Sequence, residues 1–292
     1  MIFTKKNTKE AAKSHGASKI KEDRKYILNT KSSFPLREAY KTLRTNVNFA
    51  LAETEGSKVI LVTSAMQSEG KSLNALNLAI SLAQTNHKVL IADCDLRRPK
   101  LNRLLNLSSA SGLSNLLMDS KQLDATIISH EDYGIDMLFS GDIPPNPSEL
   151  LASERMKKLL EALRGRYEYI ILDSPPVNLV VDAVVLAQQC DGVLFVVKAE
   201  RSERGAVIHA IEQLEYAKAK LLGILFNGMS PDMGIGYGKY RYRQYGRYGR
   251  YGRYGKYSRY GRYGYGGYRY GYHSMTGMLQ QGNAETEQKI RL

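Results

Sequence analysis

The sequence predicts an α/β fold: a doubly wound, mostly parallel sheet with helices on both faces. Two observations predict it. Short, continuous apolar runs alternate with amphipathic segments through the middle of the chain, and such runs are typical of strands that are covered on both faces. The amphipathic segments between them are long enough to be the crossover helices that connect parallel strands.

The position of each element follows from its pattern. The apolar runs predict strands at residues 58–64, 88–93, 167–173, 192–199 and 221–227, with a weaker sixth candidate at 135–141. The amphipathic segments predict helices at residues 35–53, 72–85, 148–163 and 203–219. Ligands of such sheets bind at the carboxyl ends of the strands. We therefore expect the functional residues directly after the strands.

Composition divides the 292 residues into three regions. Residues 1–32 are rich in lysine and lack periodic hydrophobicity, so we expect them to be a basic mobile arm. Residues 33–230 carry the alternating elements and are the expected folded domain. Residues 231–292 are rich in tyrosine, glycine and arginine and have no apolar face, so this tail is expected to be disordered.

The net charge of +13 comes mainly from the tail, because residues 237–272 hold eight arginines, two lysines and no acidic residue. The apolar runs are much shorter than the ~20 residues that cross a bilayer. The first residues do not resemble a secretory signal. The two cysteines do not form a CxxC motif, and the five histidines are scattered. We therefore expect a cytoplasmic protein without disulfides or a zinc site.

A phosphate-binding loop is predicted directly after the first strand. The stretch SAMQSEGKS, residues 64–72, fits the pattern GxxxxGK followed by Ser or Thr, except that Ala65 replaces the first glycine. In such a loop the backbone N–H groups face the phosphates, the lysine neutralises their oxygens and the hydroxyl binds Mg²⁺. A structural turn at a helix start is the alternative. The expected nucleotide-binding residues are Ala65, Gln67, Ser68, Glu69, Gly70, Lys71, Ser72 and Leu73.

Three acidic residues follow two of the predicted strands. Asp93 and Asp95 come at the end of the run at 88–93, and Asp173 closes the run at 167–173. We expect Asp95 on the turn after its strand, where both carboxylates can face the phosphate site. One acid at a strand end is usually a helix cap or a turn former. Three of them beside a loop that carries a lysine indicate a metal and nucleotide site instead.

The motifs resemble, in the same order, those of the bacterial tyrosine kinases (BY-kinases) that regulate capsule and exopolysaccharide synthesis. SAMQSEGKS is similar to the degenerate phosphate loop of that family, and VLIADCDLR and YIILDSPP are similar to its two acidic motifs. The stretch FSGDIPPNPSELL, residues 139–151, resembles its proline-rich connection. The resemblance covers residues 33–227 and is to the type whose activator is a separate chain. Gln67 and Ser68 stand where the family often has Pro-Gly.

The resemblance implies a sheet of the P-loop NTPase type and an ATP-dependent protein-tyrosine kinase. ATP and Mg²⁺ are the implied cofactors. Ser72, Asp95 and Asp173 are the residues implied to hold Mg²⁺, directly or through water.

The resemblance also assigns the residues of the phosphoryl transfer. Asp93 is implied to orient or deprotonate the attacking phenol, whose pKa is near ~10. Lys71, with Arg97 or Arg98, is implied to stabilise the transferring charge. The expected catalytic residues are Lys71, Asp93, Asp95 and Arg97.

The tail is the implied substrate, because members of the family carry a C-terminal tyrosine cluster that is autophosphorylated. Fourteen tyrosines lie within residues 237–272, and seven of them repeat every three residues from 245 to 263. Each phosphate brings about −1.5 to −2 charges, so we expect phosphorylation to cancel the charge of the tail and to loosen assembly. The expected acceptors are Tyr245, Tyr248, Tyr251, Tyr254, Tyr257, Tyr260, Tyr263, Tyr265, Tyr268, Tyr270 and Tyr272.

The helix expected at residues 35–53 places Glu38, Lys41 and Arg44 along one polar stripe. From the pattern alone this stripe suits a solvated, salt-bridged face. The resemblance implies contacts within a homo-oligomeric ring, with Lys41 in place of an arginine. It also implies other partners: a transmembrane activator of the polysaccharide co-polymerase type, a protein-tyrosine phosphatase and tyrosine-containing protein substrates. The activator would recruit the chain to the inner face of the cell membrane.

Three alternatives remain open at this point. A positioning ATPase of the ParA and MinD type shares the loop, but its signature lysine would stand at Met66. A GTPase is disfavoured because no NKxD motif follows the last strand; Asn227 there suits a contact with adenine or a strand-end turn. A nucleic-acid-binding protein is the third, because arginine, glycine and aromatic repeats stack on bases. Nucleic acid is not the partner that we expect.

Overall fold

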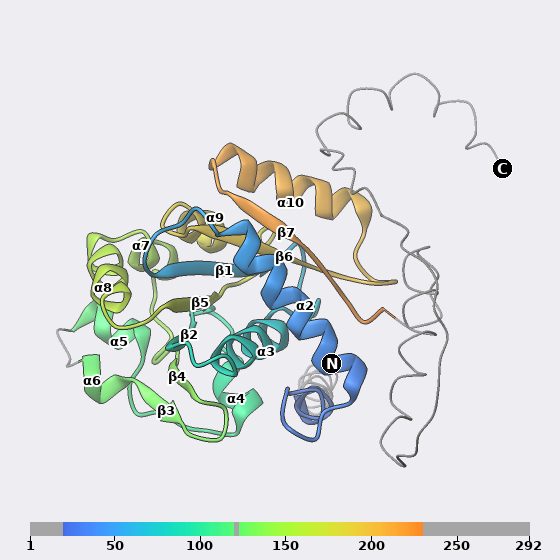
Figure 1. Cartoon of the computed structure of the whole chain (residues 1–292). Helices are drawn as coiled ribbons and strands as arrows, with labels where there is room; N and C mark the ends of the chain where they lie inside the picture. The colour runs from blue at the N-terminus through green and yellow to red at the C-terminus, as the bar shows by residue number, and fades with distance from the viewer. Residues whose placement is uncertain (1–19, 120–122, 230–292) are drawn as a thin grey trace, which may run out of the picture. The chain divides into compact units, whose positions relative to one another are not determined.

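The computed structural model describes residues 20–119 and 123–229, and Figure 1 shows their sheet and the helices around it. The seven-stranded sheet has the order β3-β4-β2-β5-β1-β6-β7. All neighbouring strands are parallel except β3 and β4. The predicted doubly wound, mostly parallel sheet is confirmed. The strands are β1 (Lys58–Ser64), β2 (Val89–Asp93), β3 (Ile128–His130), β4 (Ile135–Leu138), β5 (Tyr169–Asp173), β6 (Gly192–Lys198) and β7 (Leu221–Asn227).

Two apolar layers explain why the strand sequences are continuously hydrophobic. In β1, Ile60 and Val62 belong to one core cluster, while Val59 and Leu61 belong to the other. The first cluster is covered by α2 (Phe34–Ala50), α3 (Lys71–Ala83) and α4 (Leu101–Leu105). The second is covered by α5 (Leu113–Met118), α6 (Leu123–Thr126), α7 (Pro147–Leu151), α8 (Glu154–Arg164), α9 (Asp182–Ala187) and α10 (Arg204–Tyr216).

Two details of the predicted elements differ from the structure. The helix predicted at 148–163 is divided into α7 and α8, because Ser153 caps α8: its hydroxyl accepts a hydrogen bond from the backbone N–H of Met156. The strand predicted to be covered on both faces at 221–227 is instead the edge strand β7. Ile224 and Phe226 are 42% and 54% exposed there.

The N-terminal boundary also differs from the expectation. The composition predicts a mobile arm over residues 1–32, but within its described part, residues 20–32, Ile27 and Leu28 are buried in the core. The side chain of Asn77 on α3 fixes this segment twice: it accepts from the N–H of Leu28 at 2.8 Å and donates to the carbonyl of Tyr26 at 2.9 Å. Two adjacent apolar residues make no periodic pattern, so no sequence signal predicts this packing.

The described residues contain no helix that is both long and apolar enough to span a bilayer. The sheet register brings the predicted acids together, because Asp93 at the end of β2 and Asp173 at the end of β5 are paired residues of neighbouring strands. The loop after β1 starts at the same edge, since β1 is the other neighbour of β5.

We predict that Leu28→Ala lowers the free energy of unfolding by about 2–4 kcal/mol, because it removes a fully buried side chain. Denaturant titration of the full chain measures the change. Lys31→Ala, at an exposed position three residues away, is the control and should change it by less than about 0.5 kcal/mol. Equal effects of the two substitutions would show that this segment does not pack against the core.

Candidate active site

The loop between β1 and α3 has the backbone of a phosphate loop. Ser68 and Gly70 have positive φ angles of 67° and 97°. A Cβ atom on Gly70 would lie 2.0 Å from Nδ2 of Asn227, so only glycine fits there. Ala65, which replaces the first glycine of the pattern, is fully buried.

The phosphate loop is hydrogen-bonded to residues that end or follow β6 and β7. Glu69 is 1% exposed, and its carboxylate accepts hydrogen bonds from the N–H of Met66 at 2.8 Å and from the hydroxyl of Ser202. Nδ2 of Asn227 donates to the carbonyl of Glu69 at 2.8 Å. The Glu69 side chain therefore shapes the loop.

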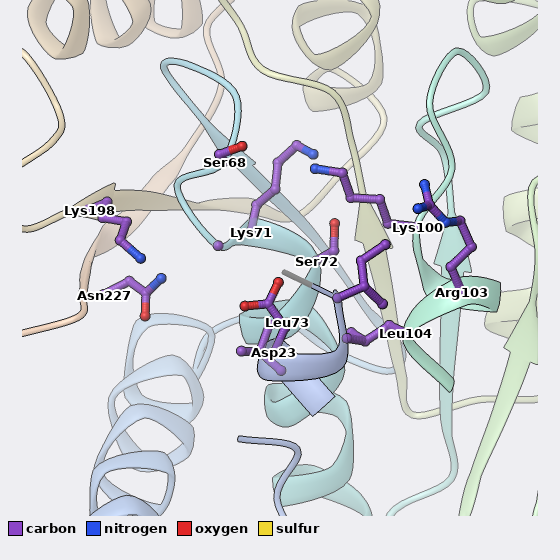
Figure 2. A pocket seen from close by; sticks show the side chains of 12 residues that line it. Asp23, Ser68, Lys71, Ser72, Leu73, Lys100, Arg103, Leu104, Lys198 and Asn227 are labelled. Atoms are coloured by element: carbon purple, nitrogen blue, oxygen red, sulfur yellow. The ribbon is translucent and has the colours of Figure 1, made fainter. Parts of the chain in front are cut away.

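A cavity of about 180 Å³ lies beside the loop, where α3 begins (Figure 2). Five of the eight predicted nucleotide-binding residues line it, namely Ser68, Gly70, Lys71, Ser72 and Leu73. Ala65, Gln67 and Glu69 are not among the residues that line it. The other lining residues are Ile20, Asp23, Lys100, Arg103, Leu104, Lys198 and Asn227.

Sequence reasoning left most of these other lining residues out. Asn227, which ends β7, was already a candidate for a contact with adenine. Lys198 ends β6, so the rule that ligands bind at strand ends could have found it too. Ile20 and Asp23 precede the first predicted element, and no pattern marked them.

Lys71 is a buried cation among buried acids. Its Nζ lies 3.4 Å from Oδ2 of Asp95, and the two side chains are 5% and 7% exposed. Burial by itself would lower the pKa of Lys71, but the charges of Asp173, Asp95 and Asp93 outweigh burial and raise it. The ammonium group therefore keeps its charge at the place where a polyphosphate needs it.

The carboxylate of Asp93 organises the turn that follows β2. One of its oxygens accepts from the N–H of Asp95 at 3.2 Å, and the other accepts from the N–H groups of Lys100 and Leu101 at 3.0 Å each. Burial and the charge of Asp173 raise its pKa, while the bonds from Lys100 and Leu101 oppose the rise. Asp93 is 1% exposed, and these three hydrogen bonds hold the turn that leads from β2 to α4.

Asp173 has two buried carboxylate oxygens without a hydrogen bond of normal geometry to any described residue. Burial raises its pKa, and the charge of Lys71 and the nearby hydroxyl of Ser72 partly counter this rise. A buried carboxylate whose oxygens lack donors is costly unless a cation or ligand completes it. Of the three predicted acids, Asp173 therefore has the clearest capacity for a further ligand.

In the described part of the chain, no three acidic, histidine or cysteine side chains gather closely enough to hold a metal ion by themselves. A Mg²⁺ ion at Ser72 and Asp173 would thus need oxygens from water and from phosphate. That is the usual way in which Mg²⁺ is held in nucleotide sites.

Arg97 does not point at the pocket. Its guanidinium binds Asp182 through two hydrogen bonds, of 2.8 Å from Nε and 3.0 Å from Nη2, and Nη2 also donates to the hydroxyl of Ser148 at 2.9 Å. Asp182 is completely buried. These contacts attach the turn after β2 to α7 and α9, so Arg97 is placed to position the acids of that turn.

Arg98 lies closer to the phosphate loop than Arg97 does. Its Nη1 donates to Oε1 of Gln67 at 3.2 Å, and its backbone N–H donates to Oδ1 of Asp95 at 3.0 Å. Of the two arginines proposed from the sequence, Arg98 has the better position for a contact with phosphate.

Comparison with known proteins decides the family. Residues 57–224 match a family model described as an AAA domain. The tyrosine-protein kinase YwqD of Bacillus subtilis (strain 168) is 37% identical over 203 residues, 70% of this chain and 85% of the relative. The tyrosine-protein kinase CpsD of Streptococcus agalactiae is 36% identical over 212 residues, 70% and 91% of the two chains. The crystal structure of the chimerical protein CapA2B2 is 38% identical, with a TM-score of 0.65 over 68% of this chain and 88% of that one.

The chain belongs to the bacterial tyrosine-protein kinases. This confirms the family and the enzyme class that the motifs indicated, and it favours a kinase over a ParA- or MinD-like ATPase. The loop, the acids and the sheet edge described above are therefore the candidate active site of a protein-tyrosine kinase.

The polar stripe of α2 is only partly solvated in the kinase. Glu38 and Lys41 form an exposed ion pair at 2.8 Å, as the pattern alone predicted. Arg44 instead donates from Nη1 to the carbonyl of Ser81, near the end of α3, at 2.5 Å. Arg44 thus packs α2 against α3 within the same chain.

We predict that Arg97→Ala lowers the free energy of unfolding of the kinase by about 1–3 kcal/mol, because Asp182 loses its charged partner while remaining buried and keeps only the hydroxyl of Ser148. In a double-mutant cycle with Asp182→Asn, the coupling energy should exceed about 1 kcal/mol. The exposed pair Lys157 and Glu154 is the control, with a coupling below about 0.5 kcal/mol. Additive effects of the two substitutions would contradict the predicted interaction between Arg97 and Asp182.

Proposed function

We propose that the kinase transfers the γ-phosphoryl group of ATP to tyrosine, and that its own C-terminal tyrosines are acceptors. The observation that carries this proposal is the buried carboxylate of Asp173. Neither of its oxygens has a hydrogen bond of normal geometry to a described residue, and the hydroxyl of Ser72 and the charge of Lys71 are nearby. In a tyrosine-protein kinase, such a group at the end of β5, near the residues that begin α3, is suited to a magnesium–nucleotide complex. Regulation of capsule or exopolysaccharide synthesis is the proposed role, by analogy with the family that the motifs resemble.

ATP and Mg²⁺ fit the residues that are present. The backbone from Gly70 to Leu73 opens α3, so its N–H groups and the helix dipole favour phosphate oxygens. Ser72 and Asp173 would hold Mg²⁺, with Asp95 acting directly or through water. When bound, the ion would neutralise charge on the phosphates.

The proposed work of the side chains is mostly positioning, because phosphoryl transfer passes through a loose transition state. The phenol oxygen forms a bond to the γ-phosphorus, the bond to the leaving ADP oxygen breaks, and the phenol proton passes to solvent water. Lys71 stabilises the charge on the transferring group, with Arg98 as a further candidate cation. Asp93, first assigned to the phenol proton, is better suited to hold the turn that carries Asp95 and Arg97.

The proposed acceptors, from Tyr245 to Tyr272, lie outside the described residues. Their proposed role rests on their number and period in the sequence and on the family resemblance. Nucleic-acid binding by the same tail is not part of this proposal.

The proposed partners follow from the resemblance too. They are a transmembrane activator of the co-polymerase type, a protein-tyrosine phosphatase, tyrosine-containing substrates and further copies of the kinase in a ring. The activator would bring the kinase to the inner face of the cell membrane. For the ring contact, the exposed Glu38 and Lys41 are better suited than Arg44, since Arg44 is already bonded to Ser81.

We predict that Lys71→Met abolishes phosphate incorporation into residues 237–272, because it removes the buried ammonium group beside the phosphates. Incubation with Mg-ATP and the activator's cytoplasmic segment, followed by phosphosite mapping, measures this. Lys88→Met, at an exposed position before β2 and at the other end of the strands, is the control and should retain incorporation. Labelling of the tail in Lys71→Met, or its absence in the unaltered kinase, would rule out the proposed site.

We predict that Lys41→Glu reduces the sedimentation coefficient of the phosphatase-treated kinase, because it puts like charges beside Glu38 on the proposed ring contact. Lys88→Glu is the control for the change in net charge. The unaltered kinase should also sediment more slowly after Mg-ATP treatment if tail phosphorylation loosens assembly. One sedimentation coefficient for all samples would exclude both ideas.

A further inference from the structure

The N-terminal segment narrows the pocket beside the phosphate loop. Residues 20–24 are helical, and Ile20 and Asp23 line the pocket together with Ser72 and Leu73. Figure 2 shows Asp23 beside Leu73 with its carboxylate directed into the pocket. The cavity that remains is about 180 Å³, whereas sites for small molecules usually measure roughly 300–1,000 Å³. A nucleotide therefore needs more room than this arrangement leaves.

The segment is attached to the domain through hydrogen bonds of residues 26–28 to a buried side chain and through more exposed hydrogen bonds of Arg24. At residues 26–28, the backbone of Tyr26 and Leu28 is bonded to the buried side chain of Asn77. The more exposed attachment is Arg24, whose guanidinium donates to the carbonyl of Leu104 at 3.1 Å, the carbonyl of Arg103 at 2.6 Å and Oδ1 of Asn106 at 3.1 Å. These acceptors lie at the end of α4, and most of the contacts are solvent-exposed.

The charge of Asp23 is opposite to that of the other charged residues that line the pocket. Four of the lining residues are cations, namely Lys71, Lys100, Arg103 and Lys198, whereas Asp23 is the one acid among the described lining residues. A polyphosphate would be attracted by the four cations and repelled by the carboxylate. At close range and partial burial, repulsion between like charges is large enough to change affinity several-fold.

We propose that residues 20–24 are an inhibitory wall of the nucleotide site. In this arrangement, Asp23 takes the place of phosphate near the pocket cations, Ile20 reduces the volume, and Arg24 holds both there. Nucleotide binding requires the wall to move away from Ser72 and Leu73, while residues 26–28 stay fixed. The inference rests on the proposed function only in taking this pocket to be the nucleotide site.

The test measures equilibrium binding of Mg-ATP and Mg-ADP to the full chain by calorimetry. Asp23→Asn keeps the shape and removes the charge, so ATP should bind about five-fold more tightly or better. The gain should be smaller for ADP, which carries less charge, and should shrink in high salt. Arg24→Ala should strengthen binding too, because it releases the wall from α4.

Glu22→Gln is the matched control, since Glu22 is an exposed acid on the same segment that pairs with Lys25. It should change affinity less than two-fold. The inhibitory wall is refuted if the unaltered chain binds ATP and the two variants, Asp23→Asn and Arg24→Ala, bind ATP equally tightly or more weakly. In that case the segment contributes nothing to affinity or supports binding. If neither the unaltered chain nor Asp23→Asn binds nucleotide, the proposed function fails and this inference fails with it. Binding by Asp23→Asn alone supports both.

Discussion

The buried ammonium group of Lys71 is the interaction on which the site depends. A cation this deep in the protein is stable only because three carboxylates surround it, and two of these are themselves fully buried in the sheet edge. The acids in turn need the cation, since burial disfavours their charged forms. The loop after β1, the turn after β2 and the end of β5 thus contribute to one charge cluster. This cluster exists only because β2, β5 and β1 are neighbouring strands.

Contacts on two sides of the charge cluster fix its position. On one side, Glu69 and Asn227 join the phosphate loop to the ends of β6 and β7. On the other, Arg97 joins the turn after β2 to Asp182 and Ser148. These residues stand outside the charge cluster, yet their contacts fix the loop and the turn that carry it. A site of this kind can tolerate a missing first glycine because so many independent contacts hold the loop.

The sequence predicted the parts of the fold that have a period or a motif. The strands at 58–64 and 221–227 have the same bounds in the structure, and the loop with Gly70 and Lys71 lies where its pattern put it. β3 was missed because three residues cannot show an alternation. The contacts of Asp93 and Arg97 could not be read from spacing, because their partners lie at positions 100, 101, 148 and 182. The packing of residues 20–28 had no signal either, since it rests on two adjacent apolar residues and the side chain of Asn77.

The edge strand β7 has a consequence for the behaviour of the purified kinase. Among the described strands it pairs with β6 alone, and the side chains of Ile224 and Phe226 are exposed on it. An apolar edge of this kind is a template onto which a strand of another molecule can be added. We therefore expect concentrated preparations to self-associate through this edge, and a lysine introduced at position 224 or 226 to reduce that association.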